Sequence, residues 1–113
     1  MSLTIVIVTF KSNHLIQKLI KSIPEKFEIL IIENSLDKNL KNSLEHDFKN
    51  VEVLLPKENL GYAGGINFGV KHAKTDYVLC LVADVIFDYK SFIEIENICD
   101  KLENFAIVAP TFN

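Results

Sequence analysis

The chain contains no arginine and no tryptophan, so lysine carries nearly all of its positive charge. Nucleic-acid-binding proteins normally present a basic face, and a formal net charge of −3 argues against that function. Without arginine, the chain also cannot form the planar two-pronged clamp that guanidinium groups make on diphosphates. A phosphate group bound here would have to be met by a metal ion, a lysine or backbone dipoles.

The chain also has few cysteines and no long hydrophobic run. Cys80 lies in an apolar segment and Cys99 in a helix-like one, without metal-type spacing, so we expect reduced, buried thiols and no disulfide. The longest apolar stretch, Leu3 to Phe10, is far too short to cross a bilayer, and no charged leader precedes it. We therefore expect a cytoplasmic protein without a transmembrane segment. Peripheral attachment to a membrane would need regions outside this chain.

Length and composition indicate one globular domain over residues 1–113. The chain is 49% hydrophobic and 24% charged, as folded domains are. No repeat, low-complexity linker or change of composition suggests a boundary. A chain of this length can bury a core without disulfides or a structural metal.

Apolar periodicity alternates between strand-like and helix-like segments. Continuous apolar runs predict five strands, at residues 4–9, 27–32, 51–55, 77–81 and 105–109. Apolar residues at helical spacing predict a helix after each of Ser12, Asp37 and Asp88, which are the expected N-caps, and one more through about Ala73. Strands separated by helices cannot pair as hairpins. We therefore predict a doubly wound α/β fold, with a mostly parallel sheet and helices on both faces.

All four glycines lie within residues 59–69, directly after the third predicted strand. Such a concentration predicts one specialised turn where a ligand or a neighbouring helix approaches the main chain closely. We expect Asn59 and Asn67 to fix this turn by bonds to the main chain. The glycines that would admit a ligand near the helix N-terminus are Gly61, Gly64 and Gly65. The alternative is tight packing of a helix on the sheet, without a ligand.

Ligands of doubly wound sheets bind beyond the carboxyl ends of the strands. The segments expected there are Thr9–Asn13, Glu33–Asp37, Lys57–Asn67 and Val82–Asp88. Several familiar phosphate-binding patterns are missing: there is no Gly-x-x-x-x-Gly-Lys-Ser/Thr segment and no Gly-x-Gly-x-x-Gly after the first strand. Simple nucleotide hydrolysis and dinucleotide redox chemistry are therefore disfavoured. A nucleotidyltransferase would need a glycine-rich basic loop after the first strand, and residues 10–13 do not form one.

Four ordered segments of the chain resemble motifs of family 2 glycosyltransferases: Val8-Thr9-Phe10, Ile32-Glu33-Asn34-Ser35, residues 59–69 and Leu81-Val82-Ala83-Asp84-Val85. The glycine segment is similar to the rhamnosyltransferase-like form Asn-x-Gly-aromatic-Ala-Gly-Gly-x-Asn-x-Gly at every position. The resemblance covers nearly the whole chain. It implies a GT-A fold that binds a nucleoside diphosphate sugar, with Mg²⁺ or Mn²⁺ on the diphosphate and inversion at the anomeric carbon.

The resemblance assigns roles to residues of all four motifs. Thr9 would touch the base, or else be an ordinary strand-end threonine. Glu33 would accept from the base or ribose, or else bond neighbouring amides. Asp84 would hold the metal, for which one carboxylate is sufficient because water and phosphate complete the shell. The full implied donor-binding set is Thr9, Phe10, Glu33, Asn34, Ser35, Asn59, Gly61, Gly64, Gly65, Asn67 and Asp84.

Glu33 stands where the family more often has aspartate, and three other positions also depart from the family pattern. Val82 stands at the first acidic place of the Asp-x-Asp motif, and it cannot bind a ribose or a metal. Lys11 replaces the usual asparagine, and Ile66 stands where the wider family often has arginine. These departures bear on metal and phosphate binding.

Catalysis by inversion needs a general base, which the family places in a C-terminal half outside this chain. We therefore expect a donor-binding domain that is completed by further chain or by a partner. It would transfer sugar to an acceptor glycan or lipid-linked sugar in the synthesis of cell-surface polysaccharide or glycan. The alternative is a noncatalytic nucleotide-binding or interaction module with a degenerate glycosyltransferase fold.

Overall fold

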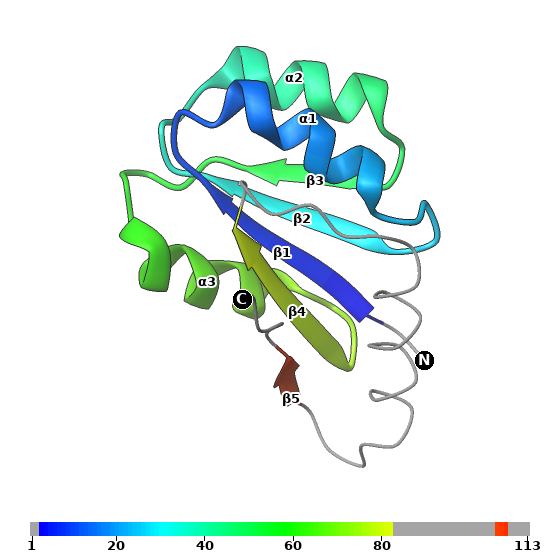
Figure 1. The fold of residues 1–113 in the computed structure, drawn as a ribbon. Coiled ribbons are helices and arrows are strands. Elements are labelled where there is room, and N and C mark those ends of the chain that lie inside the picture. Colours follow the sequence, from blue (N-terminus) through cyan, green and yellow to red (C-terminus); the bar gives the residue numbers. More distant parts are fainter. Residues whose placement is uncertain (1–2, 83–105, 109–113) are drawn as a thin grey trace, which may run out of the picture.

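The computed structural model describes residues 3–82 and 106–108, which form a five-stranded sheet with three helices (Figure 1). The strands are β1 (Leu3–Thr9), β2 (Glu28–Glu33), β3 (Val51–Leu54), β4 (Tyr77–Val82) and β5 (Ala106–Val108). They lie in the order β3-β2-β1-β4-β5, and all four pairings are parallel. The predicted parallel α/β sheet is confirmed.

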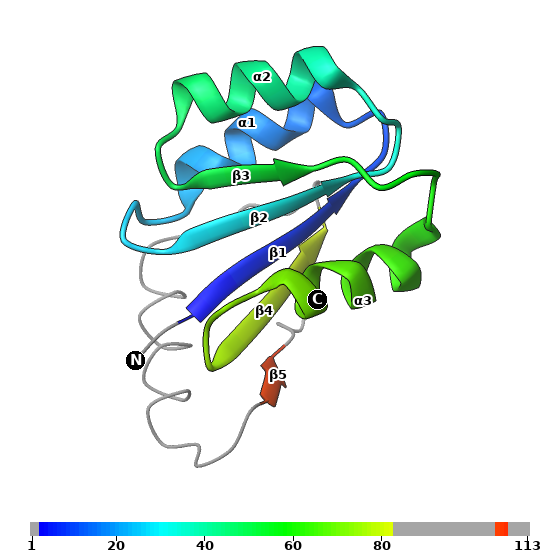
Figure 2. The same cartoon turned by 180° about the vertical axis from the view of Figure 1, so that it is seen from behind.

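Three helices cover the two faces of this sheet. They are α1 (Asn13–Ser22), α2 (Lys38–Asp47) and α3 (Gly61–His72). Helices α1 and α2 lie on one face, and α3 lies on the other, as the two opposite views show (Figures 1 and 2). The helix predicted after Asp88 lies outside the described residues. Within residues 3–82 and 106–108, none of the helices has the length and hydrophobicity to span a bilayer.

Strand β1 is buried on both sides because its side chains alternate between the two faces. Ile5 and Ile7 join the core beneath α1 and α2, while Val6 joins the core beneath α3. All three are fully buried. Burying one such aliphatic side chain contributes roughly 1.5–3 kcal/mol, so this central strand anchors both layers. The continuous apolar run in the sequence is the signature of that position.

The first two helices begin differently, although both predicted N-caps stand at the N-cap position. Asp37 caps α2, since its Oδ1 accepts hydrogen bonds from the N–H groups of Asn39 (3.0 Å) and Leu40 (3.1 Å). Ser12 does not cap α1 with its side chain: its hydroxyl donates instead to the Phe10 carbonyl at 3.2 Å. At φ −106° and ψ 27°, Ser12 lacks the extended backbone that turns a cap side chain toward the helix.

Two side chains of α2 occupy the outer edge of β3. The Lys41 ammonium donates to the Val53 carbonyl at 2.6 Å, and a Glu45 carboxylate oxygen accepts from the Val53 N–H at 2.8 Å. The two side chains also form an ion pair at 2.8 Å. Burial acts to raise the pKa of Glu45, but the hydrogen bonds from Lys41 and Val53 and the Lys41 charge leave it lowered. The Val53 N–H and carbonyl, which face the outer edge of the sheet, therefore both have hydrogen-bond partners.

The glycine segment does not form the specialised turn that the sequence predicts, because α3 begins at Gly61 and includes all four glycines. Gly61 alone among them has a left-handed backbone, with φ 72°. A Cβ on Gly65 would lie 2.9 Å from both methyls of Val8, and one on Gly69 would lie 2.5 Å from Val6 Cγ1. Tight packing of a helix on the sheet, the alternative interpretation, therefore accounts for Gly65 and Gly69.

Candidate functional site

A pocket of about 310 Å³ opens at the carboxyl ends of the central strands, beside the start of α3. Its lining combines the end of β1, the first residue after β2 and the residues that lead into the helix. The lining residues are Val8, Thr9, Phe10, Asn34, Asn59, Gly61 and Tyr62. Five of these seven belong to the set implied by the sequence motifs. Residues from three separate motifs therefore meet at one place.

The pocket lies at the end of β1, one of the two strands between which the strand order switches. Val8 of β1 pairs with Ile32 of β2 on one side and with Val82 of β4 on the other. The helix that follows β1 covers one face of the sheet, and the helix that precedes β4 covers the other (Figures 1 and 2). Ligands of doubly wound sheets bind beyond the carboxyl ends of the strands, near a switch of this kind. The last described residue of β4 thus reaches the same edge of the sheet. Asp84, the predicted metal ligand, lies outside the described residues.

Glu33 is the fully buried centre of a hydrogen-bond network at this edge. Its Oε1 accepts from the Thr9 hydroxyl (3.1 Å), the Ser35 hydroxyl (2.6 Å) and the Ser35 N–H (3.3 Å). Its Oε2 accepts from the Asp37 N–H at 2.8 Å. A buried carboxylate is costly unless donors surround it, and these four nearly exhaust its acceptor sites. The contacts support the structural role for Glu33; a nucleotide contact there stays a prediction.

Thr9 is likewise occupied by neighbouring protein groups. It is 1% exposed, its hydroxyl donates to Glu33, and its carbonyl accepts from the Asn34 N–H at 2.8 Å. A base contact through Thr9 therefore stays a prediction.

The loops after β1 and β2 are tied together at this edge. The Lys11 N–H donates to the Ser35 hydroxyl at 3.2 Å, and the Asn13 amide donates to the Asp37 carboxylate at 3.2 Å. Each loop holds one residue in the left-handed region, Lys11 (φ 53°) and Leu36 (φ 60°). Such conformations cost a non-glycine residue about 1–3 kcal/mol and persist only where surrounding bonds fix them. The hydrogen-bond network supplies those bonds.

Two asparagines fix the backbone where α3 begins. The Asn34 side chain accepts from the Leu60 N–H at 3.1 Å and donates to the Gly61 carbonyl at 3.0 Å. Asn59 accepts from the Gly61 N–H at 2.8 Å. The predicted role of Asn59 in fixing the segment through the main chain fits this geometry. The backbone of Leu60 and Gly61 is therefore held both by Asn34, which follows β2, and by Asn59, which precedes it in the chain.

Two aromatic side chains stand exposed at the mouth of the pocket, Phe10 at 51% and Tyr62 at 48%. The Lys11 ammonium lies 5.3 Å from the centre of the Phe10 ring, which brings a positive charge to the edge of the pocket. Burial, and secondarily Cys80, raises the pKa of Tyr62, and burial raises that of the half-buried Cys80 thiol. The glycine motif includes an aromatic residue at position 62, for which the sequence predicts no role.

The other predicted residues lie behind or beyond the pocket. Glu33 and Ser35 support its floor through the network, and Gly65 packs against Val8. Gly64 faces Leu60, the residue just before α3, and a Cβ on Gly64 would lie 3.0 Å from the Leu60 Cβ. Asn67 is exposed on α3 and does not line the pocket, so its predicted role in fixing the segment is not seen among the described residues.

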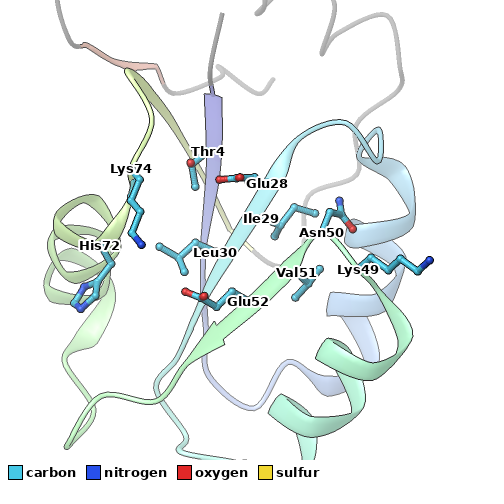
Figure 3. Close-up of a pocket in the computed structure, with 11 residues that line it drawn as sticks. Thr4, Glu28, Ile29, Leu30, Lys49, Asn50, Val51, Glu52, His72 and Lys74 are labelled. Atoms are coloured by element: carbon cyan, nitrogen blue, oxygen red, sulfur yellow. The ribbon is translucent and has the colours of Figure 1, made fainter.

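A second cavity, of about 370 Å³, lies at the opposite, amino end of the strands (Figure 3). Its charged side chains are exposed and of both signs: Glu28, Lys49, Glu52 and Lys74. It contains none of the motif residues. Because ligands of this fold class bind at the carboxyl ends, the pocket beside α3 is the candidate site.

Metal binding rests on a residue that the structure does not describe. Within residues 3–82 and 106–108, no group of three or more histidine, cysteine, aspartate or glutamate side chains is arranged to hold a metal ion. The histidines of this part, His14, His46 and His72, are all exposed. The predicted ligand Asp84 follows β4 by two residues, and its metal contact stays a prediction.

The fold and the site define a doubly wound α/β protein with a pocket at the carboxyl ends of its central strands. Residues 4–111 match the model of the family described as glycosyl transferase family 2. The chain therefore belongs to glycosyl transferase family 2.

Its relatives include polymer synthases from staphylococci. The chain is 39% identical over 69 residues to poly-beta-1,6-N-acetyl-D-glucosamine synthase of Staphylococcus epidermidis, a match that covers 58% of this chain and 16% of that protein. It is 41% identical over 69 residues to the synthase of the same name from Staphylococcus aureus strain COL, covering 57% and 16%. The match thus spans about one sixth of the length of these relatives.

Solved structures of S. aureus TarS share the fold. The crystal structure of its residues 1–349 superposes with a TM-score of 0.72 over 89% of this chain and 33% of that one, at 22% sequence identity. The structure of the same fragment in complex with UDP matches with the same score and identity, over 32% of that chain. At this identity, the likeness establishes the GT-A architecture and nothing more specific.

Proposed function

We propose that this chain is the donor-binding domain of a glycosyltransferase, which holds a nucleoside diphosphate sugar for inverting transfer to an acceptor hydroxyl. The observation that carries the proposal is the convergence of Thr9, Asn34 and Gly61, from three separate motifs, on one pocket at the carboxyl ends of the central strands. Family membership supports the reaction class. The names of the staphylococcal relatives support a role in the synthesis of a cell-surface glycan.

In this proposal, the pocket binds the nucleoside end of the donor. Phe10 and Tyr62 offer exposed aromatic faces on which a base can stack, and Gly61 lets the ribose approach the backbone. Lys11 supplies positive charge near the phosphates. Asp84 would hold Mg²⁺ or Mn²⁺, which when bound would neutralise the diphosphate. The general base would come from further chain or from a partner, as would the groups that bind the acceptor glycan or lipid-linked sugar.

Calorimetric titration with UDP, dTDP and GDP, each with and without Mg²⁺ or Mn²⁺, tests the proposal. We expect at least one nucleotide to bind, and the metal to strengthen binding in the wild type but not in Asp84→Ala. Asp47→Ala is the matched control, because it removes an aspartate from the far end of α2. Failure of every nucleotide under every metal condition would remove the proposed function. The preferred nucleotide also bears on the rhamnosyltransferase-like branch, which stays a proposal.

A noncatalytic module is the second candidate, and Val82 favours it by standing where the family has an acidic residue. This candidate predicts nucleotide binding that is insensitive to metal, or none. Transfer of radiolabelled sugar to any acceptor by the purified protein, abolished in Asp84→Ala, would eliminate it. The two candidates therefore differ in metal dependence and in turnover.

A further inference from the structure

The Asn34 side chain joins two segments that are far apart in the sequence. It follows the last residue of β2, is 3% exposed, and reaches the residues that lead into α3. Its Oδ1 accepts from the Leu60 N–H and its Nδ2 donates to the Gly61 carbonyl, across 26 and 27 residues of chain. Both ends of the amide are thus bonded to backbone, and its own N–H is bonded to Thr9.

The backbone that Asn34 holds needs such support. Gly61 has φ 72°, and no side chain caps α3 at Leu60. A helix that starts without a side-chain cap leaves its first turn free to fray unless other groups fix it. The bonds from Asn34 and the bond from Asn59 to the Gly61 N–H fix this turn in one arrangement. Gly61 and its neighbour Tyr62 then form one wall of the pocket.

We propose that Asn34 is a positioning residue of the donor site: it holds the Leu60–Gly61 backbone in the form that makes the pocket wall. This inference rests on the proposed function and deepens it, since the sequence motifs implied a direct nucleotide contact. The side chain is almost wholly buried, and each end already has a backbone partner, which favours the indirect role. The ligand it serves is a nucleoside diphosphate.

Three variants and a control test the proposal by a measurement that needs no ligand. Asn34→Ala removes both side-chain hydrogen bonds, to Leu60 and to Gly61. Asn34→Asp keeps an acceptor for the Leu60 N–H, but its carboxylate cannot donate to the Gly61 carbonyl. Asn59→Ala removes the acceptor of the Gly61 N–H. Asn42→Ala, on the exposed surface of α2, is the control. Amide hydrogen exchange by NMR should accelerate at Leu60 roughly tenfold or more in Asn34→Ala and stay near the wild-type rate in Asn34→Asp and in the control.

The second measurement is the Kd for UDP, or for whichever nucleotide the wild type prefers. We expect it to rise roughly tenfold in Asn34→Ala, and to rise also in Asn34→Asp and Asn59→Ala, at a temperature where each variant is folded. Asn42→Ala should bind as the wild type does. A residue that served only stability would lower the melting temperature and leave this Kd unchanged.

The outcomes separate the inference from the function on which it rests. We call the two hydrogen bonds from the Asn34 side chain to Leu60 and Gly61 the Asn34 clamp. Unchanged exchange at Leu60 in Asn34→Ala would show that this clamp does not hold the backbone. Accelerated exchange with an unchanged nucleotide Kd would show that the clamp exists but does not position the site. A wild type that binds no nucleotide would overturn the proposed function and the positioning role together, while the exchange data would still report on the clamp. If Asn34→Ala does not fold, the nucleotide Kd of Asn34→Asp and Asn59→Ala decides: a raised Kd in both, with Asn42→Ala unchanged, supports the positioning role, and a wild-type Kd in both overturns it.

Discussion

On one face of the sheet, α1 and α2 fill the space above the strands with large side chains, whereas α3 on the other face brings its backbone close to β1. Ile16, Leu19 and Leu44 are fully buried in the first layer. The buried residues of α3 are two glycines, Gly65 and Gly69. The same kind of contact, a helix on a parallel sheet, is thus made by two opposite means. The difference shows that the size of the side chains at the contact sets how closely a helix approaches the sheet, which we call helix depth. The helix that approaches closely, α3, also lines part of the pocket.

The largest effect is expected on the side-chain-rich face. Leu19→Ala should lower the free energy of unfolding by about 2–5 kcal/mol, because it removes buried methyl groups and leaves a cavity. Chemical denaturation monitored by circular dichroism measures the loss. The exposed Lys18→Ala is a control and should change stability little. A loss below about 1 kcal/mol for Leu19→Ala would show that this layer can collapse around the gap.

The next effect concerns the glycine face. Gly69→Ala places a methyl 2.5 Å from Val6 Cγ1, so α3 or the strand must shift. Such overpacking costs about 1–3 kcal/mol, and the better helix propensity of alanine offsets about 1 kcal/mol of it, so a net loss of up to about 2 kcal/mol is expected. Gly64→Ala is the comparison variant: its new methyl would lie 3.0 Å from the Cβ of Leu60, just before the helix, and would not meet the sheet, so we expect a smaller loss. The double variant Val6→Ala, Gly69→Ala should lose less than the sum of the two single changes.

Gly65→Ala should have a smaller effect on stability and a specific effect on the pocket. Its methyl would lie 2.9 Å from both Val8 methyls and 3.4 Å from Asn34 Nδ2. We expect a net loss of about 1 kcal/mol or less, together with weaker nucleotide binding, because the start of α3 moves away from β1. Denaturation and calorimetry on the same preparation separate the two effects. Wild-type nucleotide affinity in Gly65→Ala would contradict the view that helix depth shapes the site.

The smallest effect concerns how the helices begin, since α2 has a side-chain cap and α3 has none. The Leu40 N–H, followed by the Asn13 amide, lowers the pKa of Asp37 below its ordinary value of 3.8. A lowered pKa means that the cap stabilises the protein above the unfolded value and loses this effect as pH falls through the folded value. The melting temperature of Asp37→Ala should therefore lie below that of the wild type at neutral pH. The gap should narrow below about pH 4. Asn42→Ala, which removes an exposed side chain of α2 that does not titrate, should show no such trend.

Most of the fold was predictable from the sequence, because it follows from local pattern. The apolar run of β1 and the cap at Asp37 are short-range signals, and both predictions are confirmed. The strand bounds agree within a residue or two for the same reason. The missing cap hydrogen bond at Ser12 depended on backbone angles that the sequence does not encode locally.

The site was predictable only in part. The motifs named the residues that meet at the pocket, but not what each one touches. The carboxylate of Glu33 is surrounded by donors from another strand and from its own loop, an arrangement that only the folded backbone reveals. The glycines of α3 are explained by Val6 and Val8, about sixty residues earlier in the chain. Contacts between residues that are far apart in the chain therefore could not be predicted from the local sequence pattern.

The pair of α2 side chains on Val53 has a consequence for how copies of this protein meet. A free outer strand invites a neighbouring molecule to add its own strand and continue the ladder. Here Lys41 and Glu45 already bond the Val53 carbonyl and N–H, the backbone groups that a strand from another molecule would have to pair with. Strand addition at β3 would first have to break two hydrogen bonds and disturb the Lys41–Glu45 ion pair. This edge of the sheet is therefore protected from the edge-to-edge pairing that begins many aggregates.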